Sequence, residues 1–182
     1  MKTMLTHFNI DNSDKYASTF RGDTDMENGN FMTSTTRDRI YAEIQNLEDR
    51  RPEITERIGA ARLQGGLEEN EELIMALEDM QRIDIELVRY NEMLQNVKII
   101  QPLPTGKKKR IVIGTTVSIM NTETEAKFTY TILGVHDSDP NNGIISFKSP
   151  MGQELLAREV GDEIEVNGSY YEITKIVVKK LQ

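Results

Sequence analysis

The chain has 182 residues, of which 37% are hydrophobic and 6% aromatic, and it contains no tryptophan. This composition favours an elongated protein or two small domains over one large globule. A net charge of −8 argues against the nucleic-acid backbone as the main ligand, because such binding relies on excess lysine and arginine. The lack of cysteine excludes disulfides, thiolate nucleophiles and cysteine-bound zinc. With no apolar run near 18 residues and no signal-peptide core, we expect a soluble, cytoplasmic protein that does not bind membranes.

Residues 1–30 are rich in polar side chains, and their few apolar positions follow no period of 2 or 3.6. Such a segment cannot bury enough apolar surface to fold alone. We therefore predict a flexible N-terminal extension over 1–30. A short partner-binding or autoregulatory segment is the alternative interpretation. Five acidic residues in this stretch exclude a transit peptide.

Residues 31–100 show two apolar seams with alternating spacings of three and four. The first comprises Ile40, Ile44, Leu47, Ile54, Ile58 and Ala61, with Arg51 in one slot. The second comprises Leu73, Ala76, Met80, Ile83, Leu87, Tyr90, Leu94 and Val97. Such heptad spacing is typical of coiled-coil packing, and Gly65 and Gly66 allow the chain to reverse between the seams. We predict an antiparallel coiled-coil hairpin, about 45 Å long at 1.5 Å per residue, with an acidic tip.

Two features bear on the first helix of this hairpin. One of the hydroxyl residues at 33–36 is expected to cap its N-terminus. Pro52 lies inside the pattern, where it is expected to kink the helix or to mark a join between two segments. The neighbouring Arg50 and Arg51 suit a solvated surface with ion pairs along the helix.

The C-terminal part of the chain is expected to be β-rich. Residues 101–110 contain two prolines, a glycine and four consecutive basic residues, which predicts a linker. Contact with a protein partner or with nucleic-acid phosphate is the alternative. Residues 111–182 then form a small α+β domain. Alternating apolar residues predict strands over 111–120, 127–135, 143–147, 163–166 and 169–178. Asn167-Gly168 predicts a tight hairpin, and Ser149-Pro150 a short helix.

Several short motifs resemble the Gre family of bacterial transcription elongation factors, GreA and GreB. Those of the hairpin are Arg51-Pro52-Glu53-Ile54, Ala60-Ala61-Arg62 and the segment 65–72. Those of the C-terminal part are 113–117, Asp137-Ser138-Asp139, Ile145-Ser146, 149–152 and Val160-Gly161-Asp162. Their order and spacing extend the resemblance from about Phe31 to Lys180. It implies an α+β protein in which a helical hairpin is followed by an FKBP-like polymerase-docking domain, and it makes residues 1–30 an addition to the family pattern.

The resemblance also implies a function. The protein is expected to bind RNA polymerase at the rim of its secondary channel, as a monomer, and to insert the hairpin so that it reaches the RNA 3′ end indirectly. It would have no cofactor of its own, but a tip carboxylate would help to hold the second Mg²⁺ of the polymerase during cleavage of backtracked RNA. Glu69 is the implied metal residue, and the other implied tip residues are Glu68, Asn70, Glu71 and Glu72. The implied polymerase-binding residues are Asp137, Asp139, Ser149, Pro150 and Met151.

One departure from the family pattern leaves the activity open. The family tip reads Gly-Asp-Leu-x-Glu-Asn, and this chain has Gly66 where that aspartate stands. The protein therefore either promotes cleavage or binds the channel without promoting cleavage and inhibits or retunes the polymerase. The acidic residues at 68–72 are also what the N-terminus of a helix attracts, with no metal involved. In the same way, Ser149 is also a good helix cap. A third hypothesis, peptidyl-prolyl isomerase or chaperone activity in 111–182, rests on the implied fold alone.

Overall fold

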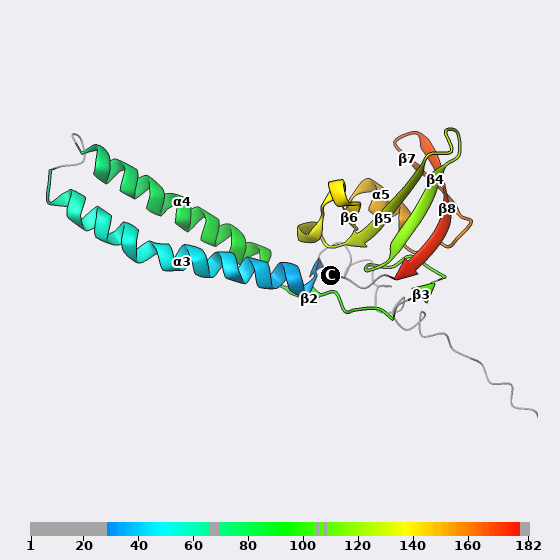
Figure 1. The fold of residues 1–182 in the computed structure, drawn as a ribbon, viewed down its shortest axis with the longest axis horizontal. Coiled ribbons are helices and arrows are strands. Elements are labelled where there is room, and N and C mark those ends of the chain that lie inside the picture. Colours follow the sequence, from blue (N-terminus) through cyan, green and yellow to red (C-terminus); the bar gives the residue numbers. More distant parts are fainter. Residues whose placement is uncertain (1–28, 66–69, 105, 108, 179–182) are drawn as a thin grey trace, which may run out of the picture. The chain divides into compact units, whose positions relative to one another are not determined.

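The computed structural model describes residues 29–65, 70–104, 106–107 and 109–178. These residues divide into two compact units. One is the segment Met32–Val97, and the other combines Phe31 with the chain from Lys98 onward. The predicted architecture, a helical hairpin followed by a small β-rich domain, is confirmed (Figure 1). No helix in the described part of the chain is long and apolar enough to cross a membrane.

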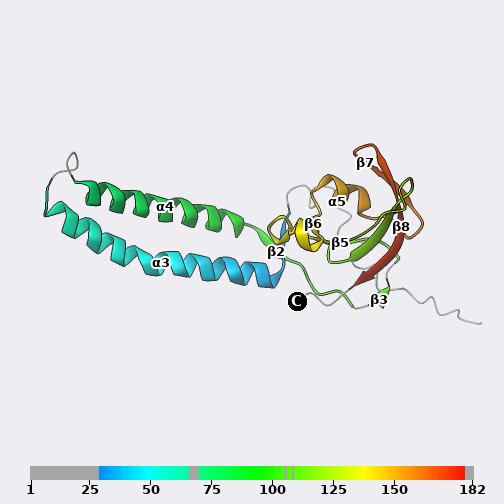
Figure 2. The same cartoon turned by 45° about the horizontal axis from the view of Figure 1, so that its top comes forward.

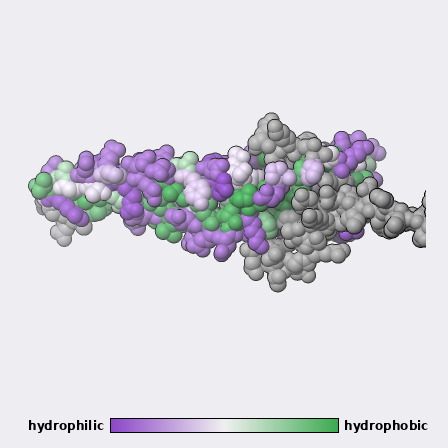
Figure 3. All heavy atoms as spheres, turned by 90° about the horizontal axis from the view of Figure 1, so that it is seen from below, coloured by the Kyte–Doolittle hydropathy of each residue, from purple (hydrophilic) through white to green (hydrophobic). Residues whose placement is uncertain are grey.

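The hairpin consists of α3 (Ser34–Arg62) and α4 (Glu71–Met93), which lie side by side in Figure 1. Its core is built from the predicted seams. The buried residues are Ile54, Ile58, Ala61, Leu73, Ala76, Ile83 and Leu87, and Ile44, Leu47 and Met80 pack against them. Alternating spacings of three and four keep one stripe of each helix turned to the other. In Figure 3, hydrophilic residues cover much of the visible face of the hairpin, with hydrophobic patches between them.

Local signals explain most of the helix boundaries. Thr33 caps α3 by accepting a hydrogen bond from the backbone N–H of Thr36 at 3.2 Å. Of the two outcomes predicted for Pro52, a kink or a join between two segments, the join is wrong, because α3 runs unbroken through Pro52. The second helix was predicted too long. It ends at Met93, because Asn96 adopts a positive φ of 53°, and Val97 opens strand β2.

Strands β1 (Asn30–Met32) and β2 (Val97–Ile99) pair in a two-stranded sheet. Neither was predicted, since three residues are too few to show a period. Within the β-rich unit, the Phe31 ring meets the Phe147 ring edge-on, with centroids 5.6 Å apart. The Phe31 carbonyl lies so close to Gly134 that a Cβ there would come within 1.8 Å of its oxygen. Phe31 is thus part of the core of the β-rich unit.

A six-stranded sheet forms the body of the β-rich unit (Figure 2). Its strands follow the order β3-β8-β4-β5-β6, with β7 also paired to β8. Their bounds are β3 (Gly106–Lys107), β4 (Thr116–Asn121), β5 (Lys127–Leu133), β6 (Ile144–Ser146), β7 (Glu163–Val166) and β8 (Ser169–Val178). All pairs are antiparallel except β5 with β6, which run parallel.

Two differences from the predicted strands have local causes. The strand predicted over 111–120 begins only at Thr116, because Gly114 has a φ of 96° that breaks the extended chain. Residues Gly106–Lys107, within the segment predicted to be a linker, pair with β8 at the edge of the sheet. The Asn167-Gly168 hairpin is confirmed, with φ values of 51° and 77° that suit a type I′ turn.

The sheet packs its apolar face against the short helix α5 (Pro150–Leu155). Ser149 caps this helix by accepting a hydrogen bond from the N–H of Gly152 at 3.1 Å, and Pro150 occupies its first turn, as predicted. Leu155 and Ile132 are fully buried in the core. Two single-turn 3-10 helices, η2 (Val135–Asp137) and η3 (Pro140–Asn142), connect β5 to β6.

Candidate functional site

The described residues closest to the tip of the hairpin are Gly65 and Asn70; the intervening Gly66, Leu67, Glu68 and Glu69 lie outside the described residues. The implied metal residue Glu69 and its neighbour Glu68 therefore remain predictions. Gly65 has a φ of 156°, a backbone conformation that L side chains rarely adopt, although nothing lies within 4 Å of where its Cβ would be. Space at Gly65 is therefore not limiting.

Asn70 connects the two helices at the base of the tip. Its side-chain oxygen accepts a hydrogen bond from the N–H of Leu73 at 3.0 Å, which caps α4. Its side-chain amide donates to the carbonyl of Ala61 at 2.6 Å, on the last turn of α3. The side chain is buried, with 9% of its surface exposed. Asn70 thus caps the first turn of α4 and adds a hydrogen bond to the last turn of α3, which joins the ends of the two helices.

Glu72 is held by an arginine of the other helix. The Arg57 guanidinium donates through Nε and Nη2 to Oε1 of Glu72, at 3.1 and 2.9 Å. Through Nη1 it also donates to Oδ2 of Asp79 at 3.0 Å. The hydrogen bond to Glu72 and then that to Asp79 raise the pKa of Arg57. Arg57 is 15 residues from Glu72 and 22 residues from Asp79 in the sequence, so no local sequence pattern predicts this cluster.

Glu71 differs from Glu72. It is exposed in the first turn of α4 and makes no ion pair with any residue that the structure describes. Of the three predicted tip residues in the described part, only Glu71 therefore presents a carboxylate that is not already held. Among the described residues there is no group of three histidine or acidic side chains that could bind a metal ion.

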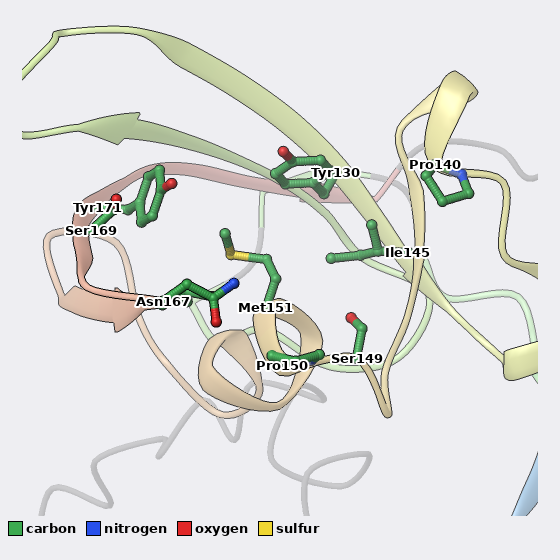
Figure 4. Close-up of a pocket in the computed structure, with 10 residues that line it drawn as sticks. Tyr130, Pro140, Ile145, Ser149, Pro150, Met151, Asn167, Ser169 and Tyr171 are labelled. Atoms are coloured by element: carbon green, nitrogen blue, oxygen red, sulfur yellow. The ribbon is translucent and has the colours of Figure 1, made fainter.

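A pocket of about 410 Å³ lies on the β-rich unit, between α5 and the sheet (Figure 4). In Figure 4 the Met151 side chain extends from α5 into the middle of this pocket, below Tyr130 and beside Ile145. Ser149 and Pro150 line it beside Met151. The remaining lining residues are Pro140, Val166, Asn167, Ser169 and Tyr171. Mostly apolar walls with a few polar groups at the edge are typical of a surface that binds a partner or ligand.

Three of the five predicted polymerase-binding residues therefore share one pocket. The other two, Asp137 and Asp139, lie on the neighbouring loop and do not line the pocket. The Asp139 carboxylate accepts a hydrogen bond from the side-chain amide of Asn142 at 2.6 Å, which stabilises the turn that presents Pro140. Asp139 is therefore a support of the pocket edge.

Sequence reasoning did not assign Tyr130, Ile145 or Tyr171 to this site. They come from three different strands, and only the folded sheet brings them to one place. Burial, and then the neighbouring Tyr171, raise the pKa of Tyr130, so its hydroxyl stays protonated at neutral pH. The pocket thus has a neutral aromatic wall.

Backbone packing also requires a small residue below the pocket. A Cβ on Gly152 would lie 2.2 Å from the carbonyl oxygen of Ser146 and 3.0 Å from Cα of Phe147. Both are backbone atoms that cannot move independently of the fold. Gly152 therefore allows α5 to approach β6 closely enough to place Ser149 and Met151 at the pocket.

The chain thus combines a helical hairpin, with acidic residues at the start of its second helix, and a β-rich unit with an apolar pocket. Family models cover both parts. The N-terminal model for transcription elongation factors matches residues 30–99, and the C-terminal GreA/GreB model matches residues 106–179. The chain belongs to the GreA/GreB family.

Two relatives that are 35% identical agree with this assignment. The transcription elongation factor GreA of Nitratiruptor sp. is 35% identical over 143 residues, covering 78% of this chain and 86% of the relative. GreA of Helicobacter pylori (strain Shi470) is 35% identical over 148 residues, covering 79% and 90%. A solved GreA/GreB structure from Nitrosomonas europaea, 18% identical, matches with a TM-score of 0.35, covering 80% of this chain and 97% of that one.

Proposed function

We propose that this protein is an elongation factor that binds bacterial RNA polymerase through its secondary channel and promotes RNA cleavage in backtracked complexes. The observation that carries the proposal is the match of family models to both units of the chain. The protein acts as an accessory factor and not as an enzyme of its own. One copy serves one polymerase, and the polymerase provides the rest of the active site.

The β-rich unit provides the docking surface in this proposal. A rim element of the polymerase places an apolar side chain against Met151, Tyr130 and Ile145, and the polar edge at Ser149 orients it. An apolar patch of this kind gives affinity, whereas polar groups at its rim give orientation. Asp137 and Asp139 act beside the pocket by shaping the loop that ends at Pro140.

The hairpin provides reach, and its tip provides carboxylates. Mg²⁺ at the polymerase active site would polarise the scissile phosphate and lower the pKa of the attacking water. Glu69 is the residue we assign to that ion, with Glu71 as the nearest described carboxylate still available. Asn70 and the Arg57–Glu72 pair have a positioning role, because they fix where the tip leaves the hairpin.

A second candidate function is binding to the channel without cleavage. Two observations favour it: Gly66 replaces the family aspartate, and Glu72 is already held by Arg57. Both reduce the number of free carboxylates, and a single ligand lacks the chelate advantage of two held at fixed separation. A factor of this kind would inhibit or retune the polymerase.

A cleavage assay on a stalled, backtracked elongation complex decides between the two functions. Cleavage above background that Glu69→Ala abolishes supports the first. Polymerase binding without cleavage, converted to cleavage by Gly66→Asp, supports the second. Circular dichroism should first establish that each variant is folded. A protein that neither binds the polymerase nor changes its activity would refute both.

A further inference from the structure

Helix α4 carries a second apolar stripe on the side turned away from its hairpin seam. The seam residues Leu73, Ala76, Ile83 and Leu87 are buried against α3. Ile74, Leu77, Ile85 and Val88 are exposed, by 40%, 36%, 58% and 58% of their surfaces. At about 100° per residue, these four positions and Gln81 fall along one line of the helix. Exposed apolar residues that occur singly need no explanation, but an aligned row does.

The positions of the apolar stripe are symmetric about Gln81. Leu77 and Ile85 each lie four residues from it, and Ile74 and Val88 each lie seven residues from it. If two α4 helices pack antiparallel with Gln81 opposite Gln81, Leu77 of one copy meets Ile85 of the other, and Ile74 meets Val88. Every apolar residue of the stripe then has an apolar partner, which is the condition for an isologous two-fold interface.

The charges beside the stripe follow the same symmetry. On one flank lie Glu71, Glu78, Arg82 and Arg89. In the antiparallel arrangement Glu78 comes near Arg82 of the second copy, and Glu71 comes near Arg89, with each pair occurring twice. Among the residues that the structure describes, the two arginines form only long ion pairs within their own helix, 3.8 Å to Asp79 and 3.6 Å to Glu86, and their side chains are 74% and 61% exposed. They are therefore available to re-pair.

We propose that free molecules of this protein associate reversibly through α4, as an antiparallel homodimer with its two-fold axis at Gln81. The symmetric spacing and the matching charges identify a second copy of this chain as the binding partner of the stripe. The interface is only about 22 Å long at 1.5 Å per residue, and stable complexes bury at least about 1,200 Å², so the dimer is weak and depends on concentration. If the proposed function holds, the dimer also keeps the hairpin from entering a channel, and the working form at the polymerase is the monomer.

Disulfide capture tests the arrangement directly, because the chain has no cysteine of its own. Gln81→Cys places a single thiol on the axis. Met75→Cys is the matched control, since Met75 is also exposed (56%) but lies about 120° around the helix from Gln81. Under mild oxidation we expect a disulfide dimer of the first variant and little of the second. An equimolar mixture of Ile74→Cys and Val88→Cys should give the mixed disulfide, whereas mainly 74–74 and 88–88 products would mean a parallel pair and overturn the model.

Sedimentation of the full-length chain over a concentration series tests the charges without any polymerase. Glu78→Arg and Arg82→Glu should each weaken self-association at least about threefold, and the double reversal should restore it. Ile85→Glu should weaken it at least about tenfold. A wild-type protein that stays monomeric throughout overturns the proposal, as does a dimer that is unaffected by all three variants. If the variants instead lower polymerase binding alone, the stripe is a polymerase contact and the dimer is wrong.

Discussion

Asn70 makes one hydrogen bond to each helix of the hairpin. Two substitutions can therefore separate how much each hydrogen bond contributes to the stability of the hairpin. Asn70→Ala removes the cap on the N–H of Leu73 and one of the hydrogen bonds to the carbonyl of Ala61, which still accepts from the N–H of Gln64 at 3.0 Å. Losing a cap costs about 1 kcal/mol, and losing one hydrogen bond to a carbonyl that keeps another costs about 0.5–1.5 kcal/mol. We therefore expect Asn70→Ala to lower the free energy of unfolding of the hairpin by about 1.5–2.5 kcal/mol.

Asn70→Asp provides the matched control. Aspartate keeps the cap, because its carboxylate also accepts from Leu73, but it cannot donate to Ala61. It also brings a negative charge to the carbonyl end of α3, where the helix dipole disfavours it. We expect Asn70→Asp to lose only the hydrogen bond to Ala61 and not the cap, which lowers the free energy of unfolding by about 0.5–1.5 kcal/mol. Both variants should be folded at low temperature.

Far-ultraviolet circular dichroism follows the hairpin selectively, because α3 and α4 contain 29 and 23 residues and α5 only 6. For a unit of 60–100 residues, 1 kcal/mol shifts the melting temperature by about 4–8 °C. Asn70→Ala should thus lower the melting temperature of the helical transition by at least about 6 °C and leave the β-sheet transition in place. A shift below about 3 °C would refute the role assigned to Asn70.

Three further predictions concern packing and docking. In denaturant unfolding, Ile83→Ala should destabilise the hairpin by about 2–5 kcal/mol. Ile85 is 58% exposed, so Ile85→Ala should change the free energy of unfolding by less than about 0.5 kcal/mol. Equal losses would contradict the burial of the seam. Gly152→Ala should destabilise the β-rich unit by about 1–3 kcal/mol because of the backbone overlap, and an unchanged melting temperature would mean that α5 packs less closely. Met151→Glu should weaken polymerase binding at least about tenfold in a pull-down titration. Val160→Glu, outside the pocket, is the control. Similar losses for both variants would mean that the pocket is not part of the docking surface.

The hairpin was largely predictable because heptad spacing is a local property of the sequence. The seam residues from Ile54 to Leu87 are buried as the pattern indicated. The end of α4 was not predictable in the same way. Leu94 and Val97 continue the spacing, but the positive φ of Asn96 ends the helix first, and a single residue in that conformation leaves no periodic signal.

The two sites were predictable only in part. Ser149-Pro150 marked the helix that carries Met151, because capping residues lie next to the helix that they begin. The Arg57 cluster and the aromatic wall of the pocket were not visible in the sequence. Arg57 meets carboxylates 15 and 22 residues away, and Tyr130 and Tyr171 are neighbours only after the sheet has formed. Contacts of this kind depend on the fold and not on local spacing.

The place of Phe31 in the core of the β-rich unit makes that unit discontinuous in the chain. Its first core residue is synthesised before the hairpin, and all the others after it. The hairpin is therefore topologically an insertion, and during translation it can fold while the β-rich unit still lacks its strands, since its contacts join helices that are adjacent in sequence. A C-terminal fragment that starts at Lys98 would lack the aromatic contact to Phe147. A chain that joins Phe31 to Lys98 through a short turn would keep it, and the excised hairpin becomes a module that could be exchanged between relatives.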